Sequence, residues 1–387
     1  MLSFNNTEVA FLSKSDRDLR KAFLLFRMVE DPALVKLGKH MVPISFKMGL
    51  PIKPIIKATI FHQFCGGENI EECRQAVEAL GKFNIGTILD YSVEGKHAEI
   101  DLDETTLEII RTAEVAKGNP MIPFCVFKVT GVARHFILEK VSEGKELTLE
   151  EKEEYKRVVG RVNRISKAAF DSGTPVFFDA EESWIQPAID DLCHSMMALY
   201  NKEKAIIFNT VQLYRHDRLQ FLKDAHVKAK QSGYHYGVKL VRGAYMEKER
   251  KRAVEMNYLS PIQPNKFTSD KDYGLSLQYC LENIDTMSIC AGSHNEDSAI
   301  YLTQLMENYK IPKNDKRIYF AQLLGMSDHI SFNLANAGYN VAKYVPYGPV
   351  KEVLPYLIRR AEENTSVKGQ TGRELSLIIR ELKRRSQ

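Results

Sequence analysis

Near the end of the chain, two adjacent arginines have the type and spacing needed to bind a carboxylate. Tyr356, Arg359, Arg360 and Glu363 follow a short strand-like run and a proline-containing turn. On a helix these four positions share one face, where two guanidinium groups can hold a carboxylate through bidentate hydrogen bonds. The alternative is a solvated helix face on which Arg359 and Glu363 form an i, i+4 pair worth about 0.2–0.5 kcal/mol. Features elsewhere in the sequence are needed to choose between the carboxylate-binding and the solvated-face interpretations.

The helix that carries these arginines is predicted to bend. Pro355 lies inside its pattern, and a proline within a regular helix costs about 3 kcal/mol because it removes a hydrogen bond and clashes with the preceding turn. We therefore expect a kink just before Arg359 and Arg360.

The composition is that of an ordinary globular protein. Of 387 residues, 44% are hydrophobic and 27% charged, and the net charge of +4 is too small to indicate nucleic acid as the main partner. Six cysteines without a C-x-x-C pair predict buried thiols in a reducing compartment. Glu8, Asp16 and Asp18 do not fit an acidic-poor transit peptide, and no apolar run reaches the ~18 residues of a membrane span. We therefore expect a bacterial cytoplasmic location.

Apolar runs and helical patterns alternate along most of the chain. Strand-like runs lie at 83–91, 122–130, 174–179, 205–213, 236–242, 287–291, 317–323 and 341–345. The runs are continuously apolar, as expected of parallel strands with both faces buried. Strands alternating with helices form parallel β-α units. Eight of them predict a distorted (β/α)8 barrel of the TIM type, with an open doubly wound sheet as the alternative.

The two ends of the chain differ from this alternating region. Residues 16–38 and 67–82 have the pattern of amphipathic helices, so residues 1–82 are predicted to form a helical section packed on the barrel. Residues 83–387 would form the barrel and a C-terminal helix. Its segment LSLIIRELKRR, at 375–385, is amphipathic and basic, so it is either a membrane-surface helix or an ordinary surface helix.

Polar side chains gather where the strand-like runs end. In a (β/α)8 barrel, the carboxyl ends of the strands and the loops after them carry the chemistry. The polar residues at these positions are Asp90, Lys128, Asp179, Glu181, Glu182, Gln212, Lys239, Arg242, Ser293, His294, Asn295, Gln322 and Tyr344. This set is larger than a purely structural barrel needs, so we expect an active site at this end.

Several common catalytic motifs are absent from the sequence. The histidines and cysteines have no H-E-x-x-H or zinc-site spacing, so no metal site is expected. The chain has no G-x-S-x-G elbow, no P-loop and no G-x-G-x-x-G after a strand, which argues against a serine hydrolase and a Rossmann dinucleotide site. A nucleotide cofactor would lie across the barrel mouth, where Lys128 and Lys239 favour an electron-rich group such as a flavin.

Six segments, in this order, resemble those of the proline dehydrogenase family. They are VFFDAEESW (176–184), FNTVQLYRHD (208–217), KLVRGAYMEKER (239–250), GSHNED (292–297), AQLLGM (321–326) and YVPYGPVKEVLPYLIRRAEENTSV (344–367). The motifs are closest to the mitochondrial, eukaryotic form of the family. The resemblance implies a barrel that holds FAD, with its eighth helix lying over the mouth.

The resemblance also implies roles for individual residues. The proline carboxylate would bind to Lys128, Arg359 and Arg360, and Asp179 would order the site beside Lys128. The residues that pack on the proline ring would be Tyr245, Leu323 and Tyr344. The residues that line the flavin would be Gln212, Lys239, Val241, Gly243, Ala244, Tyr245, His294 and Asn295, with Glu363 on a ribose hydroxyl pair of FAD.

The activity implied by the resemblance is the oxidation of L-proline to Δ1-pyrroline-5-carboxylate, the first step of proline catabolism. A hydride would pass from proline C5 to flavin N5, and a membrane quinone would take the electrons. A 4-hydroxyproline dehydrogenase is one alternative, although a smaller residue there replaces the tyrosine found here at position 344. A non-catalytic barrel that binds an amino acid or a flavin is the other.

Overall fold

A computed structural model describes residues 2–93, 98–366 and 370–387. Side chains are described at all of these positions except Pro32, 362–366 and 370–371.

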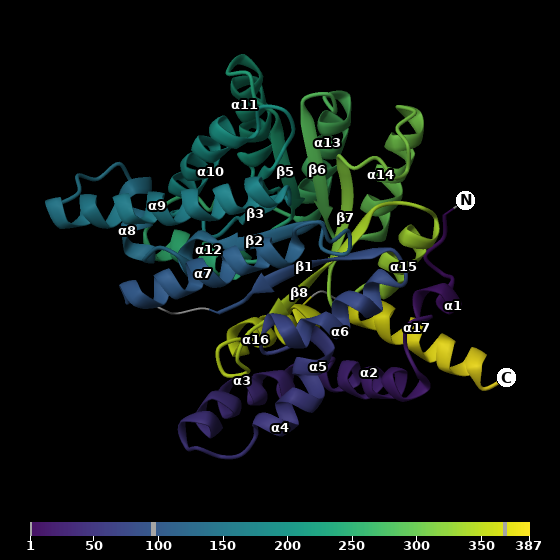
Figure 1. The fold of residues 1–387 in the computed structure, drawn as a ribbon. Helices are drawn as coiled ribbons and strands as arrows, with labels where there is room; N and C mark the ends of the chain where they lie inside the picture. The colour runs from purple at the N-terminus through teal and green to yellow at the C-terminus, as the bar shows by residue number, and fades with distance from the viewer. Residues whose placement is uncertain (1, 94–97, 367–369) are drawn as a thin grey trace. The chain divides into compact units, whose positions relative to one another are not determined.

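Eight parallel strands form a closed barrel in the order of the chain (Figure 1). They are β1 (Ile85–Tyr91), β2 (Phe124–Lys128), β3 (Val176–Asp179), β4 (Ile207–Gln212), β5 (Tyr236–Val241), β6 (Met287–Gly292), β7 (Ile318–Leu323) and β8 (Val341–Tyr347). Each strand overlaps one of the predicted apolar runs. The predicted (β/α)8 fold is therefore confirmed, and the open sheet is excluded.

The chain divides into two compact units. The second unit, residues 95–321, holds β2 to β6 and most of β7. Its helices are α7 (Glu99–Ala116), α8 (His135–Ser142), α9 (Leu149–Ser172), α10 (Gln186–Tyr200), α11 (Arg218–Gln231), α12 (Met246–Glu255), α13 (Lys266–Glu282) and α14 (Glu296–Asn308), with a 3-10 turn, η2 (Val129–Gly131), after β2.

Strand register in the second unit brings polar residues to the same end. Lys128 is the last residue of β2 and pairs with Asp179, the last residue of β3. Gln212, which ends β4, pairs with Val241, which ends β5. Because parallel neighbours end together, the polar side chains that follow each apolar run are collected at the carboxyl ends of the strands.

The first unit is built from both ends of the chain, residues 1–94 and 322–387. It contains β1 and β8, which pair in parallel, from Ile85 with Val341 to Tyr91 with Tyr347. Its helical elements are α1 (Thr7–Ala10), α2 (Asp16–Val29), α3 (Pro32–Lys47), α4 (Lys53–Ile56), the π-helix η1 (Lys57–Phe61), α5 (His62–Phe64), α6 (Ile70–Gly81), α15 (Asp328–Asn336), α16 (Leu354–Ser366) and α17 (Gln370–Arg385).

The two ends of the chain share one hydrophobic core in this unit. Phe26 of α2, Leu357 of α16 and Leu377 of α17 are buried in the same cluster. Arg385, at the end of α17, donates hydrogen bonds of 2.9 Å to the carbonyl oxygens of Phe11 and Lys14. The last helix is thereby tied to the start of the chain.

The helix predicted over 16–38 is in fact two helices, α2 and α3. Asp31 begins the second one, because its Oδ1 accepts a hydrogen bond of 2.8 Å from the backbone N–H of Ala33. Pro32 follows as the first helical residue, where a missing N–H is tolerated but the preceding helix cannot continue through it. The prediction of a single helix was wrong because it did not account for this Asp-Pro signal.

The kink predicted at Pro355 is also wrong. Helix α16 begins at Leu354, so Pro355 occupies the first turn. The N–H groups of a first turn have no partner within their own helix, so a proline there breaks no hydrogen bond.

Candidate active site

One carboxylate in the second unit lies between two lysines. Asp179 Oδ2 is 3.8 Å from Lys128 Nζ, and Asp179 Oδ1 accepts a hydrogen bond from Lys239 Nζ. Lys239 extends from β5, on the far side of β4, and only 4% of its surface is exposed. A charge buried to this degree needs a partner, so Asp179 compensates Lys239 and at the same time orients Lys128.

The apolar surroundings of Lys239 strengthen this pair. Its ammonium lies 5.2 Å from the centroid of the Phe177 ring, a cation–π contact. In the strand register Lys239 stands opposite Cys290, whose pKa is raised by burial to about 12. Cys290 is therefore a neutral thiol, and no thiolate competes with the Asp179 carboxylate for Lys239.

Glu181 holds the turn that follows Lys128. It is a buried residue in the loop after β3. Its carboxylate accepts a hydrogen bond of 3.0 Å from the backbone N–H of Thr130 and another from the Thr130 hydroxyl. Burial raises the pKa of Glu181 to about 7. The sequence placed Glu181 at a strand end but assigned it no role, because a contact between two different loops leaves no local pattern.

Gln212 has a buried acceptor suited to a bound group. Its side chain is 2% exposed, and among the described residues nothing donates a hydrogen bond to its Oε1. A buried carbonyl oxygen without a hydrogen bond destabilises the folded protein. A ligand N–H that donated to it would therefore stabilise the complex. The Gln212 side chain can therefore accept a hydrogen bond from a bound group.

The residues after β5 present an open backbone. Gly243 and Ala244 are exposed, and Val241 and Tyr245 are half-buried. Gly243 has φ of +133°, and a Cβ at this position would overlap the ring of Tyr214. Only glycine tolerates both the positive φ and the close approach of the Tyr214 ring. The backbone at Gly243 can therefore lie against Tyr214 while remaining exposed to solvent.

The loop after β6 is fixed by Arg242, whose role the sequence did not reveal. Its guanidinium donates hydrogen bonds to Asp270 (2.6 Å), Ser293 (2.9 Å) and Ser298 (2.8 Å). These contacts hold the turn that contains His294 and Asn295, both half-buried. The position of Arg242 directly after Val241, within KLVRGAY, was the available signal.

Asn295, predicted to line the flavin, also has a structural role. It is the N-cap of α14, and its Oδ1 accepts a hydrogen bond of 2.8 Å from the N–H of Ser298. Capping of this kind satisfies a helix N–H that has no partner within the helix.

In the first unit, α16 carries the predicted arginine pair. Arg360 is 7% exposed, and its guanidinium lies 5.2 Å from the centroid of the Tyr356 ring. Arg359 is half-buried beside it. The shared helix face expected for these residues is therefore present up to Arg360, and the side chain of Glu363 lies outside the described part of the chain.

Leu323 and Tyr344, the two predicted ring-packing residues of this unit, are neighbours. The N–H of Leu324 donates a hydrogen bond of 2.8 Å to the carbonyl oxygen of Tyr344. Lys343, fully buried, pairs with Asp328 at 2.6 Å and donates hydrogen bonds to the carbonyl oxygens of Leu323 and Met326. This buried cation fixes the loop that begins at Leu323.

The predicted residues thus fall into two groups. Lys128, Asp179 and Lys239 form one cluster in the second unit. The flavin-lining residues Gln212, Val241, Gly243, Ala244, Tyr245, His294 and Asn295 lie at the strand ends of the same unit. Leu323, Tyr344, Arg359 and Arg360 belong to the first unit.

The apolar face of the C-terminal helix is buried within the protein. Leu377 and Ile378 of α17 are each 1% exposed, and α17 packs against α2. The basic residues of α17 remain at the surface, Leu377 and Ile378 belong to the core, and Ile379 is 48% exposed. Across the described residues, no helix has the length and apolar character needed to cross a membrane.

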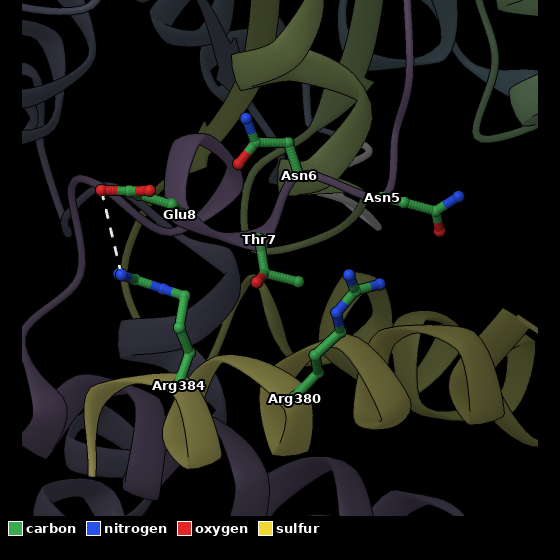
Figure 2. A pocket seen from close by; sticks show the side chains of 6 residues that line it. All are labelled: Asn5, Asn6, Thr7, Glu8, Arg380 and Arg384. Carbon is green, nitrogen blue, oxygen red and sulfur yellow. Dashed lines mark ion pairs between the residues drawn. The ribbon is translucent and has the colours of Figure 1, made fainter. Parts of the chain in front are cut away.

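A surface hollow between α1 and α17 is separate from these residues (Figure 2). Asn5, Asn6, Thr7 and Glu8 line one side, and Arg380 and Arg384 the other. Arg384 Nη1 lies 3.8 Å from Glu8 Oε1. The hollow contains no residue predicted for the active site.

The sequence matches a known family and named relatives. Residues 73–373 match the family model described as Proline dehydrogenase. A relative from Dictyostelium discoideum named Proline dehydrogenase 1, mitochondrial, is 33% identical, over 98% of this chain and 74% of the relative. A relative from Xenopus laevis named Hydroxyproline dehydrogenase is 32% identical, over 99% of this chain and 90% of the relative.

Solved structures share the fold. The structure of proline utilization A from Bdellovibrio bacteriovorus, inactivated by N-propargylglycine, aligns with a TM-score of 0.73 and 21% identity over 93% of this chain. The alignment covers 38% of that protein, so this chain spans less than half of its length. At this level of identity the likeness concerns the fold alone.

The predicted bacterial cytoplasmic location is wrong. The Dictyostelium relative is named mitochondrial, as are relatives from Drosophila melanogaster, Homo sapiens and Arabidopsis thaliana. These relatives are named as mitochondrial proteins, and their names do not support a bacterial cytoplasmic location. The prediction rested on Glu8, Asp16 and Asp18, yet in the structure Asp16 and Asp18 belong to a folded helix, where acidic residues carry no information about targeting.

Proposed function

The chain belongs to the proline dehydrogenase family, and we propose that it oxidises L-proline to Δ1-pyrroline-5-carboxylate with FAD as its cofactor. The observation that carries the proposal is the Asp179 carboxylate, 15% exposed and held between Lys128 and Lys239 near the carboxyl ends of β2, β3 and β5. A cluster of charged side chains at the carboxyl ends of barrel strands is expected at a functional site rather than in a structural core.

The substrate carboxylate is proposed to bind to Arg359, Arg360 and Lys128. A pair of guanidinium groups suits a planar carboxylate. The contact of Arg360 with the Tyr356 ring limits the rotamers of the Arg360 side chain. Lys128 adds a point charge whose direction is set by Asp179. Together these groups would hold the proline in one orientation, which is where most of the protein's contribution to the rate is expected.

The proline ring is proposed to pack on Tyr245, Leu323 and Tyr344. Leu323 and Tyr344 are held by the backbone contact between their strands and by the buried Lys343. Tyr344 is 8% exposed, so its ring is largely fixed by its surroundings. A fixed wall of this kind would select a ring of the right size and exclude water.

FAD fits the residues of the second unit. The acceptor Gln212 Oε1 lacks a donor among the described side chains, and Lys239 supplies a cation close to where an electron-rich ring would bind. The exposed backbone of Gly243 and Ala244 and the half-buried His294 and Asn295 would complete its surroundings, with Glu363 on the ribose. When bound, FAD would accept the hydride from proline C5. Its electrons are proposed to leave through a membrane quinone.

Hydroxyproline is the second candidate substrate, because the Xenopus relative carries that name. The bulk of Tyr344 favours proline, since a hydroxyl on the ring would need room beside this buried side chain. The two substrates are distinguished by their kcat/KM values. A higher value for hydroxyproline would overturn the assignment of proline.

The reaction itself is tested optically. Purified protein loaded with FAD and mixed with proline in the absence of oxygen should lose its yellow absorbance band. A flavin that binds but keeps its colour with both proline and hydroxyproline would reduce the chain to an amino-acid or flavin-binding barrel.

A further inference from the structure

Helix α3 in the first unit carries a stripe of apolar side chains that the described part of the chain leaves largely exposed. Leu34, Leu37, Met41, Ile44 and Met48 are between 48% and 69% exposed. Their spacing of three, four, three and four residues places them on one face of the helix and of the turn that ends it. We call these five residues the α3 stripe.

The α3 stripe is not the face by which α3 is folded into the protein. Val42 and Phe46 pack against the hydrophobic core of the first unit, and α3 contacts α2 and α16. The apolar surface of α3 is thus wider than the part that its neighbours cover. Contiguous exposed apolar surface of this kind marks a binding face rather than ordinary surface.

After its N-cap Asp31, α3 and the segment that follows it carry charge of one sign. From residue 32 to residue 67 the sequence contains Lys36, Lys39, Lys47, Lys53 and Lys57 and no aspartate or glutamate. Lys53 and Lys57 pair with Glu68, and Lys36, Lys39 and Lys47 are exposed side chains of α3 itself. Beyond its N-cap, the surface that α3 presents is therefore apolar and cationic.

This combination decides between two occupants. A second copy of the chain, pairing stripe to stripe, would bring the lysines of two helices together, and like charges would oppose the contact. An anionic lipid surface satisfies both features, because apolar side chains enter the acyl boundary while lysines remain among the headgroups. We propose that α3 is an interfacial helix that binds the surface of an anionic membrane through the α3 stripe.

The proposal replaces α17 with α3 as the membrane-facing element. Leu377 and Ile378 of α17 are in the core, whereas the residues of the α3 stripe are exposed and can leave water. Lipid binding would stand even if the chain did not oxidise proline, because it depends on the surface of α3 alone. It can therefore be tested without any measurement of activity.

The test is co-sedimentation of the full chain with vesicles. Two kinds are used, phosphatidylcholine alone and phosphatidylcholine with about one third phosphatidylglycerol. We expect binding to the anionic vesicles, weakened by salt because lysine contacts are screened. The double variant Leu34→Ser with Leu37→Ser should bind about tenfold more weakly or worse, since it removes two of the five apolar side chains.

The matched control is Leu107→Ser with Leu199→Ser. These leucines lie on α7 and α10 and are 49% and 58% exposed, against 48% and 58% for Leu34 and Leu37. The control removes the same atoms at the same exposure, so it should bind as the unchanged protein does. Equal loss of binding in both double variants would refute the role of the α3 stripe.

A third variant tests the charge. Replacing Lys36, Lys39 and Lys47 by glutamine should lower binding to anionic vesicles and flatten its dependence on salt. Equal binding to both kinds of vesicle, or none to either, would overturn the proposal. So would a chain that forms dimers without lipid and loses only dimerisation when Leu34 and Leu37 are replaced, because the occupant would then be a second copy.

Discussion

Lys239 on β5 reaches past β4 to pair with Asp179 on β3. Both charges are removed from bulk water, Lys239 almost completely, with its side chain 5% exposed. Such a pair resists the loss of either member, because the remaining charge stays buried without compensation. The cluster of Lys128, Asp179 and Lys239 therefore stabilises the fold and also orients Lys128.

Replacing Lys239 with methionine should lower the free energy of unfolding by about 3 kcal/mol, since Asp179 loses its contact with Lys239 while Lys128 Nζ lies 3.8 Å away. Urea unfolding measures this change. Adding Asp179→Asn should restore part of the loss, because the uncompensated carboxylate is then removed. The control is Lys167→Met, at an exposed pair with Asp171, which should change the free energy of unfolding far less.

Arg359→Lys and Arg360→Lys should each raise the KM for proline by about 10- to 100-fold. Each substitution replaces a guanidinium, which can make two charge-assisted hydrogen bonds to a carboxylate, by an ammonium that acts as a point charge. Each such bond contributes roughly 1.5–3 kcal/mol. Steady-state kinetics measures the effect, with Arg111→Lys, an exposed arginine of α7, as the control. If KM were unchanged in both variants, the pair would be structural.

Gly243→Ala should destabilise the protein and weaken flavin binding. The positive φ and the ring of Tyr214 both exclude a side chain, and strain of this kind costs about 1–3 kcal/mol. Thermal unfolding and the flavin absorbance of the purified protein report the two effects. Gly160→Ala, in open space on α9, should do the opposite and stabilise by up to about 1 kcal/mol.

Glu181 should make stability fall as pH rises through neutrality. Its folded pKa of about 7 is raised from an ordinary 4.5 by burial, with Glu182 acting in the same direction and Lys128 against it. The stabilisation is thus fully present below pH 4.5 and is lost as pH rises through about 7.

Glu181→Gln removes this titration while keeping an acceptor for Thr130. Relative to the unchanged protein, it should gain up to roughly 3 kcal/mol of unfolding free energy between about pH 4 and pH 8. Urea unfolding at several pH values gives the difference. Two parallel curves would mean that Glu181 ionises in the fold as it does in the unfolded chain.

The sequence predicted the barrel and its strand ends well, because both follow from local pattern. Lys128, Asp179 and Gln212 end β2, β3 and β4 as expected. The pair between Lys239 and Asp179 could not be predicted, since it joins strands that are not neighbours and depends on the curvature of the barrel. No period in a sequence encodes that distance.

The sequence also could not show which amphipathic helices bury their apolar faces. Helices α3 and α17 are both amphipathic and basic, yet Leu377 and Ile378 of α17 are in the core whereas the α3 stripe is exposed. An apolar stripe shows that a helix has a face to cover, but the neighbour that covers it is decided by packing between distant segments. Leu377 on α17 meets that neighbour, and Leu37 on α3 does not.

The first unit joins residues 1–94 to residues 322–387, with the whole second unit between them in the sequence. During synthesis on a ribosome, the hydrophobic cluster around Phe26 of α2 therefore stays incomplete until α16 and α17 have been made. Chaperone binding to nascent chains should accordingly concentrate on the N-terminal helices. A ribosome stalled before Leu354 should hold a chain whose beginning is still open to proteases.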